Sequence, residues 1–85
     1  MIILDIDIEK GEGKIIDYKG QKLGIYKNEN GKIFAVIPDC TYEGCRLNWD
    51  KKEKNWVCPC CGSRFSYEGK VINGPATENL EKATI

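Results

Sequence analysis

All five cysteines of this 85-residue chain lie between Cys40 and Cys61. They form two groups, with Cys40 and Cys45 in one segment and Cys58, Cys60 and Cys61 in the next. A domain of this size buries too little apolar surface for a large core, so we expect sulfur chemistry to help stabilise it. Two loops that bring thiolates face to face are also how small proteins hold a soft metal ion or an iron–sulfur cluster.

Several classes of function are excluded by what the chain lacks. It contains no histidine, so a His general base, a Ser–His–Asp triad and a His-ligated zinc centre cannot be built. Thirteen basic and thirteen acidic residues give a formal charge of zero, and no basic field points to nucleic acid. The chain has no signal-peptide pattern, and its apolar runs are too short for a transmembrane helix. We therefore expect a cytoplasmic protein with no membrane or nucleic-acid partner.

The hydrophobic pattern predicts an all-β domain. Apolar and polar residues alternate in the first part of the chain, and Asn30-Gly31 is a hairpin signal. Pro38 ends this part, and residues 40–63 are predicted as loop except for one short strand. Short strands at this spacing are typical of a small antiparallel sandwich or barrel, here a single domain over residues 1–85. The predicted strands are 4–8, 14–18, 21–27, 32–37, 55–57 and 70–73.

The residues themselves leave the use of the thiols open. A knot of disulfides is typical of small secreted domains, but these usually have an even number of cysteines and a signal peptide. A metal site fits a chain without such a signal, and one disulfide with the remaining thiols as ligands also fits an odd count. Gly44 and Gly62 allow the backbone to approach a bound group closely. Asp39 and Asp50 flank the loops as alternative oxygen ligands, although turn residues of this type are commoner.

A longer motif runs through both cysteine groups and beyond them: Cys40-x-x-x-Gly44-Cys45-x-Leu47, Trp56-x-Cys58-Pro59-Cys60-x-Gly62-Ser63-x-Phe65, Gly69, and Gly74-Pro75-Ala76. The chain resembles a Rieske [2Fe–2S] domain over residues 23–80, most closely the Rieske domains that end some flavin-dependent oxidoreductases. The resemblance implies stacked antiparallel sheets, three in the family, and a cluster-binding subdomain made by two loops within residues 40–63. It also implies an electron carrier rather than an enzyme, with a redox partner of the flavin-dependent oxidoreductase class.

The resemblance assigns roles to most of these positions. Cys40 and Cys58 match the two thiolates on the inner iron of the family's cluster. Cys45 and Cys60 match the pair that forms a disulfide between the loops in many members. Ser63 matches a hydroxyl that hydrogen-bonds a bridging sulfide of the cluster.

Two positions depart from the family's pattern. Tyr42 and Cys61 stand where the family has its two ligand histidines. Cys61 can serve as a thiolate ligand instead, whereas the oxygen of Tyr42 lies farther from the backbone than an imidazole nitrogen, so we expect an aromatic lid. Gly74 and Pro75 match the loop that covers the cluster. Phe65 stands where high-potential members have a tyrosine that hydrogen-bonds a cysteine sulfur.

We therefore predict an electron-transfer module with a [2Fe–2S] cluster held mainly by cysteines. Its ligands are Cys40, Cys58 and Cys61, with Cys45 or Cys60 as the fourth if the disulfide does not form. One alternative is a structural or interaction domain in which four thiols hold Zn²⁺ or a single iron. Another is a metal-free Rieske fold held by the disulfide and used as a binding surface.

Overall fold

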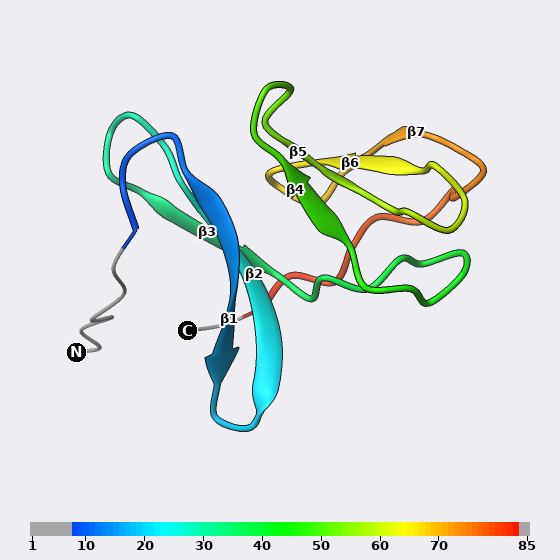
Figure 1. The fold of residues 1–85 in the computed structure, drawn as a ribbon, viewed down its shortest axis with the longest axis horizontal. Coiled ribbons are helices and arrows are strands. Elements are labelled where there is room, and N and C mark those ends of the chain that lie inside the picture. The colour runs from blue at the N-terminus through cyan, green and yellow to red at the C-terminus, as the bar shows by residue number, and fades with distance from the viewer. Residues whose placement is uncertain (1–7, 84–85) are drawn as a thin grey trace.

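The computed structural model describes residues 8–83 of the chain. Within this range seven short β-strands form two antiparallel sheets (Figure 1). No helix occurs within this range, and the predicted all-β class is confirmed. The described residues form two sheets, whereas the family resemblance implied three. The first sheet contains β1 (Gly13–Tyr18), β2 (Gln21–Lys27) and β3 (Ile33–Val36); the second contains β4 (Asn48–Asp50), β5 (Asn55–Val57), β6 (Arg64–Ser66) and β7 (Val71–Asn73).

The first sheet is a meander of two hairpins, as the alternating pattern predicted. β1 pairs with β2, and β2 pairs with β3, within one or two residues of the predicted bounds. In the second hairpin, the side-chain oxygen of Asn28 accepts hydrogen bonds from the backbone N–H of Asn30 and Lys32 at 2.9 and 2.8 Å. Gly31 takes a φ of 86°, which a residue with a side chain rarely adopts. The strand predicted at 4–8 lies, except for Ile8, outside the described residues.

The second sheet places four strands in sequential order, and two of them were not predicted. The prediction of a strand at 55–57 is confirmed as β5, and β7 begins one residue after its predicted start. β4 and β6 fall in or beside the segment predicted as loop. Each is three residues long, which is too short for a periodic pattern to be recognised.

Aromatic side chains fill the space between the two sheets. Trp56 and Phe65, partners across β5 and β6, are completely buried. The backbone of β2 lies against this layer, because a Cβ added at Gly24 would stand 2.9 Å from the Trp56 ring. Cys40 and Cys58 belong to the same buried cluster. The two cysteine loops are therefore anchored in the core of the domain.

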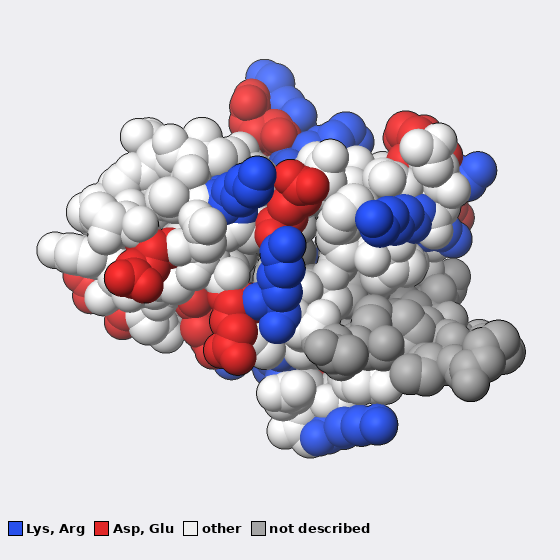
Figure 2. All heavy atoms as spheres, turned by 180° about the vertical axis from the view of Figure 1, so that it is seen from behind, with Lys and Arg blue, Asp and Glu red and all other residues white. Residues whose placement is uncertain are grey.

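The segment after β7 returns along the molecule and ties the sheets together. Leu80 N donates to Gly69 O at 2.7 Å, and Val36 forms an isolated bridge with Lys82. In Figure 1 this segment, coloured orange to red, passes beside the loop that joins β3 to β4. Figure 2 shows the opposite face, where basic and acidic side chains are interspersed. That distribution agrees with the formal charge of zero.

Candidate metal centre

The first cysteine loop, residues 40–45, is closed by its own backbone. Cys40 N donates to Cys45 O at 2.9 Å, and Gly44 N donates to Cys40 O at 2.8 Å. Gly44 has a φ of 76°, in the left-handed region that favours glycine. The loop therefore turns back on itself and presents the side chain of Cys40 from a fixed position.

The second loop, residues 58–63, repeats this hydrogen-bond pattern. Cys58 N donates to Ser63 O at 2.8 Å, and Gly62 N donates to Cys58 O at 2.9 Å. Gly62 has a φ of 81°, so both loops use a glycine at the same place. The two loops thus present Cys40 and Cys58 as equivalent residues.

Backbone N–H groups point at the sulfur of each of these cysteines. Tyr42 N and Glu43 N lie 3.4 and 3.5 Å from Cys40 Sγ. The backbone N–H groups of Cys60 and Cys61 are hydrogen-bonded to Cys58 Sγ in the same way. Such donors stabilise negative charge on sulfur, as a thiolate ligand requires. These backbone donors were not predicted; the only sign of them in the sequence is a glycine four residues after Cys40 and Cys58.

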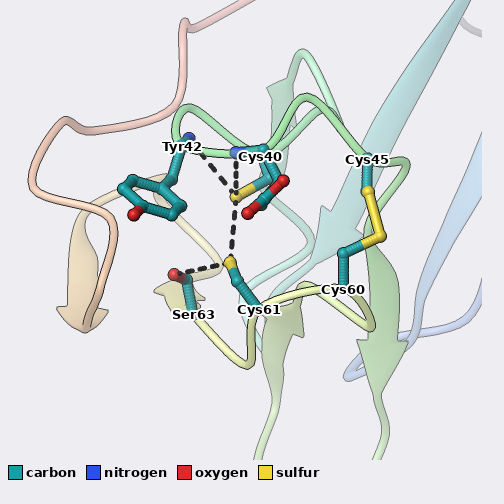
Figure 3. The surroundings of a disulfide bond; sticks show 7 residues. Cys40, Tyr42, Cys45, Cys60, Cys61 and Ser63 are labelled. Carbon is teal, nitrogen blue, oxygen red and sulfur yellow. Dashed lines mark hydrogen bonds between the residues drawn. A yellow bond between two sulfur atoms is a disulfide. The ribbon is translucent and has the colours of Figure 1, made fainter.

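Three free thiols converge where the loops face each other. The Sγ atoms of Cys40, Cys58 and Cys61 all lie within 4.8 Å of one another. Cys40 Sγ and Cys61 Sγ are 3.7 Å apart, and Figure 3 shows them pointing toward each other from opposite loops. A tetrahedral ion with metal–sulfur bonds of about 2.3 Å separates its sulfur ligands by about 3.8 Å. These three thiols are therefore positioned as soft ligands.

The thiols differ in how readily they ionise. Burial raises the pKa of Cys58, and the backbone N–H groups at its sulfur partly oppose that rise. The hydroxyl of Ser63 is the main cause that lowers the pKa of Cys61, a half-buried residue. Since metals bind the thiolate form, Cys61 is the easier of these two to deprotonate.

The remaining two cysteines are joined to each other. Cys45 and Cys60 form a disulfide with an S–S distance of 2.02 Å, which links the two loops (Figure 3). This is the pair that the family resemblance implied. While the disulfide is intact, neither cysteine can be the fourth ligand. Cys58 Sγ nevertheless lies within 4.8 Å of both disulfide sulfurs.

Ser63 connects the centre to the segment that follows β7. Its side chain is completely buried, and its Oγ lies 3.1 Å from Cys61 Sγ and accepts a hydrogen bond from Ala76 N at 2.9 Å. Thr41 Oγ1 donates to Glu78 O at 2.7 Å, a contact that was not predicted. The segment holding Ala76 and Glu78 is thus tied to both loops. It includes the predicted pair Gly74-Pro75, whose peptide bond is cis.

Tyr42, the expected aromatic lid, and Phe65, which matches the tyrosine of high-potential members, have different surroundings. Tyr42 is 60% exposed, and Figure 3 shows its hydroxyl pointing away from the sulfur atoms of Cys40 and Cys61. Phe65 is completely buried in the core between the sheets.

The two candidate oxygen ligands are engaged elsewhere. Asp39 pairs with Arg46 at 2.7 Å, and Asp50 pairs with Arg64 at 2.9 Å. Asp50 also accepts the backbone N–H of Glu53, which is the main cause that lowers its pKa. Both aspartates are therefore ion-paired, Asp39 in an isolated bridge with Arg46 and Asp50 at the end of β4, where it accepts hydrogen bonds from the turn that follows.

Comparisons with known proteins agree on one family. A family model described as the Rieske [2Fe-2S] domain matches residues 1–84. YhfW of Bacillus subtilis, which carries the name of a Rieske 2Fe-2S iron-sulfur protein, is 41% identical over 76 residues, covering 89% of this chain and 15% of that protein. The cytochrome b6-f complex iron-sulfur subunit of Chlorobaculum tepidum is 38% identical over 69 residues, covering 81% of this chain and 38% of that protein. The crystal structure of the plasma membrane Rieske protein PetC3 from Synechocystis PCC 6803 superposes with a TM-score of 0.76 at 36% identity, covering 85% of this chain and 74% of that one.

These relatives correct the expected localisation. The expectation of a cytoplasmic protein is wrong, because the similar proteins include a plasma membrane Rieske protein and a subunit of a cytochrome b6-f complex. The expectation relied on this chain's own residues, and the chain spans only 15% of YhfW and 38% of the Chlorobaculum tepidum subunit. Within residues 8–83, no helix is long and apolar enough to cross a membrane.

Proposed function

Because this chain belongs to the Rieske [2Fe-2S] domain family, we propose that residues 1–85 form a single Rieske-like domain that carries one electron at a time. The observation that supports this most directly is the convergence of Cys40, Cys58 and Cys61 from two facing loops, residues 40–63. Soft thiolates are the ligands that iron–sulfur clusters use. The domain has no substrate chemistry of its own and acts as an electron carrier.

The donor set fits the family's cluster in three of four positions. We assign Cys40 and Cys58 to the inner iron and Cys61 to the outer iron. Tyr42 and Cys61 take the places of the family's two histidines, since they stand two and three residues after the first cysteine of their loops. While Cys45 is held in the disulfide, the fourth position is left to a group other than cysteine.

The chain's own residues prepare this site for an anionic group. When bound, the cluster supplies a one-electron couple. Backbone N–H groups stabilise negative charge on Cys40 Sγ and Cys58 Sγ, and the Ser63 hydroxyl does so at Cys61 Sγ. In this proposal Tyr42 remains an aromatic lid at the edge of the site, where its side chain is exposed.

The partner in this proposal is a larger redox protein of the flavin-dependent oxidoreductase class. The matched 76 residues are only 15% of YhfW, which supports a domain of this kind working beside a much larger unit. A reduced flavin can release its two electrons one at a time, and a one-electron carrier is suited to receive them. Stopped-flow mixing of a reduced flavoprotein with the oxidised domain measures this transfer directly.

The ligand assignment is tested by paired variants of the anaerobically purified chain. We expect Cys61→Ser to lose the visible absorption and the EPR signal of the reduced cluster. Tyr42→Phe serves as the control and is expected to keep both, because its ring remains and only the hydroxyl is removed. Loss of both signals in Tyr42→Phe, with both retained in Cys61→Ser, would overturn the assignment of the outer ligand.

A mononuclear site is the second candidate, and one distance favours it. The 3.7 Å between Cys40 Sγ and Cys61 Sγ is the spacing of two ligands on one tetrahedral ion. Ligands on different irons of a cluster lie farther apart. Metal analysis separates the two functions, since a single zinc or iron without sulfide indicates a mononuclear site.

A further inference from the structure

The Cys45–Cys60 disulfide lies against the free thiols in a way that points to a second state of the same centre. We propose that reduction of this disulfide frees Cys45 to join Cys40, Cys58 and Cys61 in a four-thiolate tetrahedral site for one soft divalent cation. Cys60 stays outside the site. The proposal rests on the proposed function only in taking the same three thiols as metal ligands.

One cysteine connects the two sulfur groups. Cys58 Sγ lies within 4.8 Å of the sulfurs of Cys40 and Cys61, and also within 4.8 Å of the sulfurs of Cys45 and Cys60. Tetrahedral coordination with metal–sulfur bonds of about 2.3 Å requires sulfur separations of about 3.8 Å. The 3.7 Å between Cys40 Sγ and Cys61 Sγ already meets this requirement. A released Cys45 sulfur is therefore already beside one of the three ligands, Cys58, and has to approach the other two.

Spacing and surroundings select Cys45 as the fourth ligand. Cys40 and Cys45 form a C-x4-C pair, and Cys58 and Cys61 form a C-x2-C pair, so each loop contributes two ligands at a spacing found in structural zinc sites. Cys45 is half-buried and packs against the core cluster that holds Cys40 and Cys58.

Cys60 is less suited to this role. It is exposed, and it directly precedes Cys61 in the chain. Figure 3 shows the sulfurs of these two neighbours on different sides, with Cys61 facing Cys40 and Cys60 facing Cys45. Directing both sulfurs to one ion requires the loop itself to rearrange. The exposure of Cys60 instead makes the disulfide accessible to a reductant.

The chemistry of the switch is a thiol–disulfide exchange. A dithiol reductant donates two electrons and two protons, the bond between Cys45 Sγ and Cys60 Sγ breaks, and the reductant becomes a disulfide. Binding of one divalent cation then displaces the protons of four thiols. With no histidine in the chain, the soft ligands that the two loops offer are cysteine thiolates.

The first test uses the full chain without substitutions. Zn²⁺ affinity is measured by chelator competition on the disulfide-intact chain and on chain reduced with dithiothreitol and desalted anaerobically. We expect the reduced chain to bind Zn²⁺ on the order of 100-fold more tightly, since it gains one of four thiolate ligands. Alkylation of the zinc-loaded reduced chain, located by mass spectrometry, should modify Cys60 and spare Cys45. Equal affinities, or Cys45 alkylated as fast as Cys60, would overturn the proposal.

A matched pair of variants separates the two released cysteines. Cys60→Ser and Cys45→Ser each break the same disulfide and remove one sulfur. We expect Cys60→Ser to bind Zn²⁺ as tightly as reduced wild type, and Cys45→Ser to bind on the order of 100-fold less tightly. The reverse order contradicts the choice of Cys45. If either variant fails to fold, the alkylation of wild type still decides. Iron and sulfide in the disulfide-intact chain report separately on the proposed function.

Discussion

Replacement of Ser63 by alanine should weaken the fold and change the reactivity of one thiol. Ser63 Oγ is completely buried and accepts a hydrogen bond from Ala76 N at 2.9 Å. The alanine variant leaves this buried N–H without a partner, which costs about 1–3 kcal/mol of unfolding free energy. For a domain of this size, a loss of about 2 kcal/mol lowers Tm by roughly 8–16 °C.

The same substitution affects Cys61. In the metal-free chain, the Ser63 hydroxyl is the main cause that lowers the pKa of Cys61. Its removal should raise that pKa, so that alkylation of Cys61 reaches its half-maximal rate at a higher pH than in wild type. Iodoacetamide modification followed by mass spectrometry across pH measures this shift, and thermal unfolding by circular dichroism measures Tm.

Ser66→Ala is the matched control for both measurements. Ser66 Oγ accepts hydrogen bonds from Glu68 N and Lys70 N at 3.2 Å, in a turn exposed to water. Water can replace these bonds, so we expect a smaller change in Tm and no change in the pH dependence at Cys61. If Ser63→Ala behaves like Ser66→Ala in both assays, the role given to the Ser63 hydroxyl is wrong.

Three further predictions concern the redox site and the fold. With a thiolate in place of a neutral histidine, the cluster should have a potential below the Rieske range of about −150 to +300 mV and nearer to about −400 mV, without pH dependence around neutrality; film voltammetry tests this, and a midpoint above about 0 mV contradicts it. Gly24→Ala should lose about 1–3 kcal/mol in urea unfolding, because the added Cβ meets the Trp56 ring at 2.9 Å, and unchanged stability contradicts that packing. The backbone N–H of Glu53 and the guanidinium of Arg64 lower the pKa of Asp50 in the folded state, so its stabilisation is present above the unfolded pKa of about 3.9 and is lost as pH falls through the lower folded value. The stability difference between wild type and Asp50→Asn should therefore close at acid pH, and a difference that persists there refutes the linkage.

The longer strands could be predicted from the sequence because each shows a complete alternation. β1 and β2 are six and seven residues long, and Asn30-Gly31 marks the second hairpin. β4 and β6 were missed because three residues show no period, and their pairing depends on contacts with β5. The spacing of the predicted turns was still sufficient to identify the all-β class.

The sequence indicated which cysteines belong to the candidate site, but not which of them are paired or how the loops hydrogen-bond to their sulfurs. Clustered cysteines without histidine indicated a thiolate site, and the family resemblance selected Cys40, Cys58 and Cys61 as its ligands. The family resemblance supplied the pairing of Cys45 with Cys60, since cysteine counting alone leaves several pairings open. The hydrogen bonds from backbone N–H groups to sulfur depend on loop conformation, which residue types alone do not determine.

The measurement that tests the central claim most directly is the metal and sulfide content of the chain, purified anaerobically with its disulfide intact. The account predicts two irons and two acid-labile sulfides per chain, with Cys45 and Cys60 resistant to alkylation until a reductant is added. One zinc or one iron per chain without labile sulfide would contradict it.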